Sequence, residues 1–212
     1  MPALETLRDR LLNLGHSPTD TPEQRVRKSS VTLVALLKAP GCFVWAAMYM
    51  MLGLRGASYF PFVYMFIIFG SIALFGWLKN YQLLLSTMLG GLLLLPFGLQ
   101  LHLGGLAPSG AVSIWAFLSP LGALFFGGPR YAQPWFLAFL LLFGGSAFAE
   151  AYLSSPAPVE PWVAKFFFLM NIAGVGGICF FTMRYFSIAL KREKTARRAC
   201  CSTSCPRPSP SE

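Results

Sequence analysis

The chain has 212 residues, of which 55% are hydrophobic and 12% are charged, and its mean hydropathy is +0.58. A soluble domain carries about 25% charged residues, so this composition excludes a water-exposed globule, and the high hydrophobicity excludes a disordered chain. The net charge of +9 does not indicate a nucleic-acid partner, because the bases cluster at the chain ends and in short turns. The sequence therefore predicts an all-α, polytopic membrane protein whose surroundings are the lipid bilayer.

Residues 1–29 are predicted to form a cytoplasmic N-terminal segment. Within residues 1–14, four leucines fall on one helical stripe, which is typical of a short amphipathic helix lying on a membrane surface: Leu4, Leu7, Leu11 and Leu14. A polar tail with scattered leucines is the alternative. The run Thr21-Pro22-Glu23 then predicts a helix start, with a capping hydroxyl followed by a proline at the first helical position.

Residues 30–188 are predicted to form a membrane domain of six transmembrane helices. A spanning helix needs about 20 mostly apolar residues. Strands of a transmembrane barrel would alternate apolar and polar residues, which the run Leu92 to Leu95 does not. The six apolar stretches cover roughly residues 31–53, 60–78, 82–101, 111–128, 133–153 and 162–188.

The distribution of basic residues predicts the orientation of these helices. An even number of spans places both termini on one side, and Arg55 is the one base in the turns of the opposite side. Cytoplasmic segments carry the excess of Lys and Arg, so both termini are expected in the cytoplasm. The bases on the predicted cytoplasmic side are Arg25, Arg27, Lys28, Lys79, Arg130, Lys191, Arg192, Lys194, Arg197 and Arg198.

A few polar residues within the spans are candidates for a ligand site, because each is costly to bury in a membrane. One outward-facing pocket for an unidentified small ligand could be lined by Gln100, His102, Glu150, Lys165 and Asn171. The alternative is that these side chains meet the interface or bond neighbouring helices. Lys38 lies within about two turns of the predicted inner boundary, where long basic side chains extend to the interface. No metal-binding motif, paired-carboxylate arrangement or cofactor motif occurs, so neither a metal nor a cofactor is expected.

Small residues recur at helical spacing in two of the predicted spans. Ser119, Ala123 and Gly127 repeat every four residues in the fourth stretch, and Ala173 and Gly177 do so in the last. Such spacing allows another helix to approach closely. The pattern predicts helix packing, either within the chain or between two copies of it.

Residues 103–126 read LGGLAPSGAVSIWAFLSPLGALFF. This run resembles part of the six-helix membrane domain that precedes the catalytic domain in bacterial class III adenylate/guanylate cyclases. Further matches in the expected order extend the resemblance over about residues 15–198. They are TPEQRVRK at 21–28, GPR at 128–130, NIAGV at 171–175 and RYF at 184–186.

The resemblance implies a module that anchors a cyclase in the bacterial inner membrane, forms a homodimer and transmits a signal in cyclic-nucleotide signalling. Residues 189–198 would begin the cytoplasmic signalling helix that leads to the catalytic domain. No cyclase domain follows them, so the chain itself is not expected to be an enzyme, whereas its parent polypeptide would be a cyclase. Two other readings are a small transporter or membrane-embedded enzyme acting on a lipid-like molecule, and a structural anchor without a ligand.

Residues 199–212 depart from the preceding sequence in being rich in cysteine, serine and proline. We expect an aberrant tail produced by a shift of reading frame, and a disordered tail is the alternative. Starting two bases later, the codons of this segment permit Leu-Leu-Leu-Asn-Val-Leu-Pro, followed after two residues by Ile-Ala-Glu-Arg. That string resembles the segment joining membrane helix and catalytic domain in these cyclases.

Overall fold

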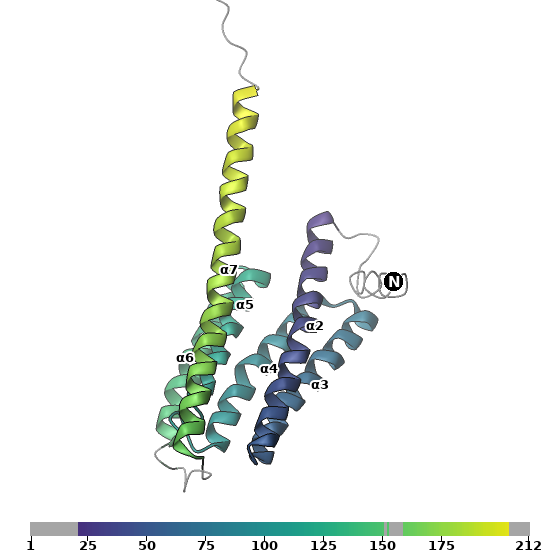
Figure 1. Cartoon of the computed structure of the whole chain (residues 1–212). Helices are drawn as coiled ribbons and strands as arrows, with labels where there is room; N and C mark the ends of the chain where they lie inside the picture. Colours follow the sequence, from purple (N-terminus) through teal and green to yellow (C-terminus); the bar gives the residue numbers. More distant parts are fainter. Residues whose placement is uncertain (1–20, 151, 153–158, 204–212) are drawn as a thin grey trace, which may run out of the picture. The chain divides into compact units, whose positions relative to one another are not determined.

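The structure is a computed structural model that describes residues 21–150, 152 and 159–203. Every regular element within these residues is a helix (Figure 1). The chain divides into two compact units, residues 1–171 and residues 172–212, and the last helix passes from the first unit into the second. The elements are α2 (Pro22–Met51), α3 (Arg55–Leu78), α4 (Tyr81–His102), the 3₁₀ helix η1 (Val112–Phe117), α5 (Leu118–Gly127), α6 (Pro129–Glu150) and α7 (Pro161–Thr203).

The prediction of an all-α membrane protein is confirmed in class, because five helices within the described residues are long and apolar enough to cross a membrane. The stretch predicted at 111–128 differs: it is shorter, covers Val112–Gly127, and begins as a 3₁₀ helix. A 3₁₀ helix rises about 2.0 Å per residue against 1.5 Å in an α-helix, so η1 and α5 together extend about 27 Å. The amphipathic helix expected within residues 1–14 lies outside the described residues.

Local signals in the sequence set the helix boundaries. The predicted start at Thr21 is confirmed: its hydroxyl accepts from the backbone N–H of Gln24 at 3.3 Å, and the Gln24 side chain accepts from the Thr21 N–H at 2.9 Å. Asn80 caps α4 by accepting from the N–H of Leu83 at 3.1 Å. Both arrangements satisfy backbone donors that have no partner within the helix.

Helix α4 is the central element of the first unit. It packs against α3, η1, α5 and α6, and Figure 1 shows it between the α2–α3 pair and the α5–α6 pair. The Tyr64 hydroxyl of α3 donates to the carbonyl of Met88 at 3.4 Å, and the Ser119 hydroxyl of α5 donates to the carbonyl of Leu89 at 2.9 Å. Flanking helices are therefore joined to the backbone of α4 within the apolar interior.

The small residues predicted to mediate packing lie in different settings. Ser119 and Ala123 are fully buried, and Ala123 packs in one cluster with Leu85 and Leu89 of α4. Gly127 lies against the ring of Tyr131, which a side chain at Gly127 would strike. Ala173 and Gly177 belong to the second unit, and their packing role stays a prediction.

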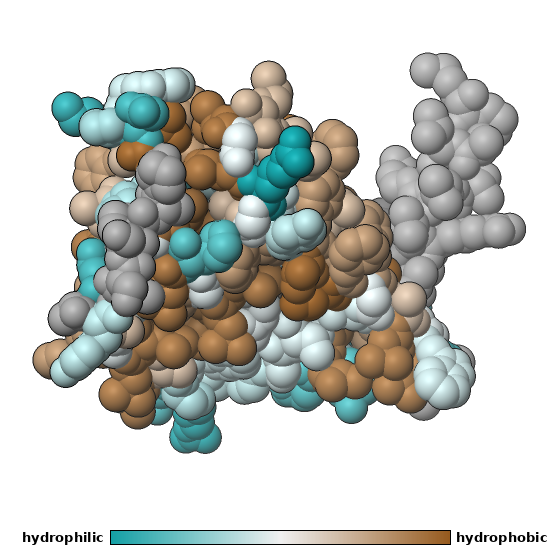
Figure 2. All heavy atoms as spheres, turned by 90° about the horizontal axis from the view of Figure 1, so that it is seen from below, coloured by the Kyte–Doolittle hydropathy of each residue, from teal (hydrophilic) through white to brown (hydrophobic). Residues whose placement is uncertain are grey.

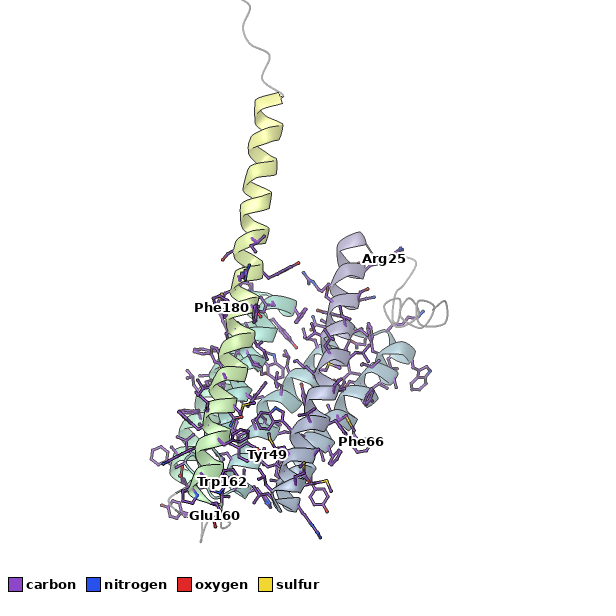
Figure 3. All side chains as sticks on the ribbon, viewed as in Figure 1. Arg25, Tyr49, Phe66, Glu160, Trp162 and Phe180 are labelled. Atoms are coloured by element: carbon purple, nitrogen blue, oxygen red, sulfur yellow. The ribbon has the colours of Figure 1, made fainter. Side chains whose placement is uncertain are left out.

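Hydrophobic side chains cover much of the outer surface. Figure 2 shows an extensive hydrophobic face with scattered hydrophilic patches. Phe66, which is 69% exposed, points away from α3 in Figure 3, whereas Tyr49 is 1% exposed. A surface of this kind suits contact with lipid chains, because water would penalise so much exposed apolar area.

Of the second unit, the structure describes the remainder of α7, which continues as a helix to Thr203. The helix therefore includes residues 199–203, the start of the segment expected to be an aberrant or disordered tail. Proline disrupts a helix through its own ring and missing N–H, and the first proline of the tail is Pro206. Residues 199–203 contain no proline and can therefore stay helical. The rest of the predicted tail, residues 204–212, lies outside the described residues.

Candidate functional site

Several side-chain hydrogen bonds of the first unit lie where the chain leaves α4 and returns toward η1. The returning segment, residues 103–111, turns tightly, with backbone hydrogen bonds from Gly105 N–H to the Gln100 carbonyl at 2.9 Å and from Ala111 N–H to the Leu106 carbonyl at 2.8 Å. Gly105 and Gly110 adopt φ angles of 117° and 62°, which favour glycine. These two glycines place the backbone against α6 and the beginning of α7.

Glu150 ends α6 directly over this returning segment. Its Oε2 atom accepts from the backbone N–H of Leu106 at 3.2 Å. The carboxylate also lies so close to Gly105 that a Cβ atom there would collide with it. Glu150 therefore fastens α6 to the returning segment, and the absence of a side chain at Gly105 makes that contact possible.

Gln100 lies on the face of α4 that meets the same helix. It is 1% exposed, and its Nε2 atom donates to the hydroxyl of Ser146 at 3.2 Å. Ser146 in turn donates to the carbonyl of Phe143 at 2.8 Å. Ser146 and Glu150 are one turn apart on α6, so Gln100 and Glu150 contact neighbouring positions of one helix.

Asn171 joins η1, the returning segment and α7. Its Oδ1 atom accepts from the indole N–H of Trp115 at 2.8 Å, and its Nδ2 atom donates to the carbonyl of Gly110 at 2.8 Å. Asn171 is fully buried. Within the first unit, this side chain is a polar link between a spanning helix and the turn that precedes η1.

An aromatic cluster, formed by Trp45, Tyr49, Trp115 and Phe167, packs around this link. The Tyr49 and Phe167 rings stack with centroids 4.8 Å apart, and Trp45 lies 5.7 Å from Phe167 and 6.2 Å from Trp115. Stacked and edge-on aromatic pairs stabilise a packed interior beyond the area that they bury. The sequence analysis did not identify Tyr49 or Phe167 as site residues. The signal that the sequence offered is the spacing of Trp45 and Tyr49, which places both side chains on one face of a helix.

The remaining two predicted site residues lie elsewhere. The His102 ring packs on Phe60 of α3 with centroids 5.7 Å apart and lies directly over Gly56, and Lys165 is exposed on α7. Gln100 and His102 are two residues apart, which places them on opposite faces of α4. Gln100 therefore contacts α6 one turn from Glu150, Glu150 and Asn171 both bind the returning segment, and His102 and Lys165 lie apart from them.

Three buried polar atoms near these groups have no hydrogen-bond partner among the described residues: the Tyr49 hydroxyl, the Ser113 hydroxyl and the Oε1 atom of Gln100. Most buried polar atoms in proteins are paired, so unpaired ones mark places where a further hydrogen-bonding group would be accommodated favourably. All three are uncharged. Chemically, this region can form hydrogen bonds to a neutral partner or to water.

Comparisons of the chain find no matching family model, no matching curated protein and no matching solved structure. The resemblance to cyclase membrane domains therefore depends on the residues of the sequence alone.

Proposed function

We propose that the chain is a signal-transducing membrane module of a nucleotide cyclase, located in the inner membrane of a bacterium. In this proposal six segments cross the membrane, both termini lie in the cytoplasm, and a second copy of the chain forms a dimer with it. The catalytic step belongs to a domain beyond the module. A transporter or membrane-embedded enzyme for a lipid-like molecule is the competing assignment.

The observation that supports the proposal is the continuity of α7. Its apolar part, Pro161–Tyr185, is long enough to span a membrane, and the same helix continues without a break to Thr203. The continuation carries several bases, including Lys191 and Arg192, which favour the cytoplasmic side. An unbroken helix that leaves a membrane can transmit a rotation or displacement, because its backbone hydrogen bonds resist local bending.

The segment Val112–Gly127 is the sixth crossing in this proposal. Together η1 and α5 extend about 27 Å, close to the roughly 30 Å of a hydrocarbon core. The hydrogen bonds of Asn171 with Gly110 and Trp115 then connect α7 to the start of this crossing. A change in packing at the returning segment would thereby act directly on the helix that leaves the membrane.

A fusion protein tests whether α7 transmits a signal. A class III cyclase catalytic domain is joined after Arg198, and one to four alanines are inserted after Ile188. Each inserted residue rotates the following helix by about 100°. We expect cyclase output to change several-fold with one or two insertions and to return toward the parent value with four, when the phase is nearly restored.

The matched control joins the same catalytic domain after Ile188 through a flexible Gly/Ser linker, where added residues should leave output unchanged. Equal output from all insertion variants of the helical fusion would contradict signal transmission and would leave α7 as an anchor.

A further inference from the structure

Lys38 of α2 lies near the middle of the apolar part of the first unit. The Phe43 and Phe62 rings meet with centroids 6.5 Å apart, so these residues lie at the same level of α2 and α3. From Phe62 to the end of α3 at Leu78 is about 24 Å, and Lys38 lies about 8 Å nearer that end than Phe43. Lys38 is therefore about 16 Å from the basic end of the unit, the end that carries Arg25 and Lys79.

The helix bounds place Lys38 deeper than the two turns expected from the sequence. Arg25 and Glu160 lie at opposite ends of the unit in Figure 3, and a hydrocarbon core of roughly 30 Å has its middle near 15 Å. An extended lysine side chain covers about 6 Å, so the Lys38 ammonium does not reach the interface. The first apolar stretch was expected to begin at residue 31, whereas the apolar part of α2 begins at Arg27.

Within the part of the chain that the structure describes, no acidic side chain pairs with Lys38. No Asp or Glu occurs between Glu23 and Glu150, and Glu150 binds the returning segment. Among the described residues Lys38 forms no hydrogen bond and no ion pair. An ionisable side chain inside a membrane is costly, and such residues typically pair with an oppositely charged group.

The surface beside Lys38 is open to the surroundings of α2. Lys38 itself is half-buried, its neighbour Leu37 is 69% exposed, and a Cβ atom at Gly41 would meet no atom within 4 Å. Gly41 lies one turn from Lys38, so the missing side chain leaves room next to the ammonium. A molecule dissolved in the bilayer can therefore approach Lys38 laterally.

We propose that Lys38 binds the head group of a membrane-soluble carboxylic acid. Such an acid enters the hydrocarbon as a neutral molecule and releases its proton to water, and its carboxylate pairs with the Lys38 ammonium. The resulting carboxylate–ammonium pair carries no net charge, which removes the cost of an isolated charge. The alkyl chain lies along α2 among Leu37, Gly41 and Val44. This site is defined by α2 and is independent of the proposed cyclase function.

Photo-crosslinking in membrane vesicles tests the site with a long-chain fatty acid that carries a diazirine, and with its methyl ester. We compare the parent chain, Lys38→Arg, Lys38→Met and the control Lys165→Met. The acid should label α2 in the parent, in Lys38→Arg and in Lys165→Met, and labelling should fall at least five-fold in Lys38→Met. The ester, which offers no carboxyl group, should label all four chains at the low level.

Lys38→Met removes a charge from an apolar helix, so its membrane insertion should be preserved, and extraction with detergent verifies this. Equal labelling of the parent and Lys38→Met by the acid, or equal labelling of the parent by acid and ester, would overturn the proposal.

Discussion

Replacing Gly110 with alanine is expected to lower the free energy of unfolding by about 3 kcal/mol or more. A Cβ atom at this position would lie 2.5 Å from the backbone nitrogen of Phe168 and 2.8 Å from the carbonyl oxygen of Ala164. These atoms belong to the backbone of α7 and cannot move aside as a flexible side chain would. The φ angle of 62° adds a cost of about 1 kcal/mol or more for a residue with a side chain.

Gly53 provides the matched control for this substitution. It also adopts a positive φ, 78°, but a Cβ atom there would meet no atom within 4 Å. Gly53→Ala should therefore cost about 1 kcal/mol, from the backbone conformation alone. Thermal unfolding of the purified chain in detergent measures both variants. Similar losses for Gly110→Ala and Gly53→Ala would show that α7 does not pack against the returning segment at Gly110.

Replacing Asn171 with leucine is expected to lower the free energy of unfolding by about 2–5 kcal/mol, because each buried polar group left unpaired costs roughly 1–3 kcal/mol. The change leaves the indole N–H of Trp115 without an acceptor and the carbonyl of Gly110 without its side-chain donor. Both hydrogen bonds are 2.8 Å long, and Asn171 is fully buried. The same thermal unfolding measurement in detergent applies.

Two further variants separate this hydrogen-bond loss from a general effect on α7. Met170→Leu alters a neighbouring side chain that is 41% exposed and should change stability by less than about 0.5 kcal/mol. Trp115→Phe removes the indole donor, so adding it to Asn171→Leu should cost less than the sum of the two single changes. Strict additivity of Asn171→Leu and Trp115→Phe would contradict the hydrogen bond between them.

The spanning elements were largely predictable because hydropathy over about 20 residues reports directly whether a helix can lie in lipid. The conformation of residues 112–117 was not predictable in this way. An apolar segment has the same mean hydropathy whether it folds as an α-helix or as a 3₁₀ helix, because hydropathy carries no information on which carbonyl accepts each backbone N–H. The capping of α2 by Thr21 was predictable because all its groups lie within three residues.

The sequence grouped the candidate site residues by depth alone and carried no information on their direction around the helices. Gln100, His102, Glu150, Lys165 and Asn171 were grouped by their expected level in the membrane. The structure then directs Gln100 toward Ser146 of α6 and His102 toward Phe60 of α3. Which face of α4 meets which neighbour depends on the packing of distant segments, and a single sequence carries no signal for such pairs.

The pairing of Asn171 with Trp115 illustrates the same limit. Both residues stood out, Asn171 as a polar residue in an apolar span and Trp115 within the run that resembles cyclase membrane domains. Their hydrogen bond joins segments 56 positions apart in the chain. The glycines of that run could be recognised as turn residues, whereas their contacts with Glu150 and with α7 depend on tertiary packing.

The arrangement of the chain in the membrane is tested most directly by reporters that are active only outside the cytoplasm, fused after successive turns. We expect activity from fusions after Gly53, Gly105 and Pro158, and none from fusions after Asn80 and Arg130. This result would place six crossings and both termini as proposed, so that α7 leads into the cytoplasm. Activity on the same side after Gly105 and Arg130 would show that residues 112–127 do not cross, and the fully reversed pattern would direct α7 away from any cytoplasmic domain.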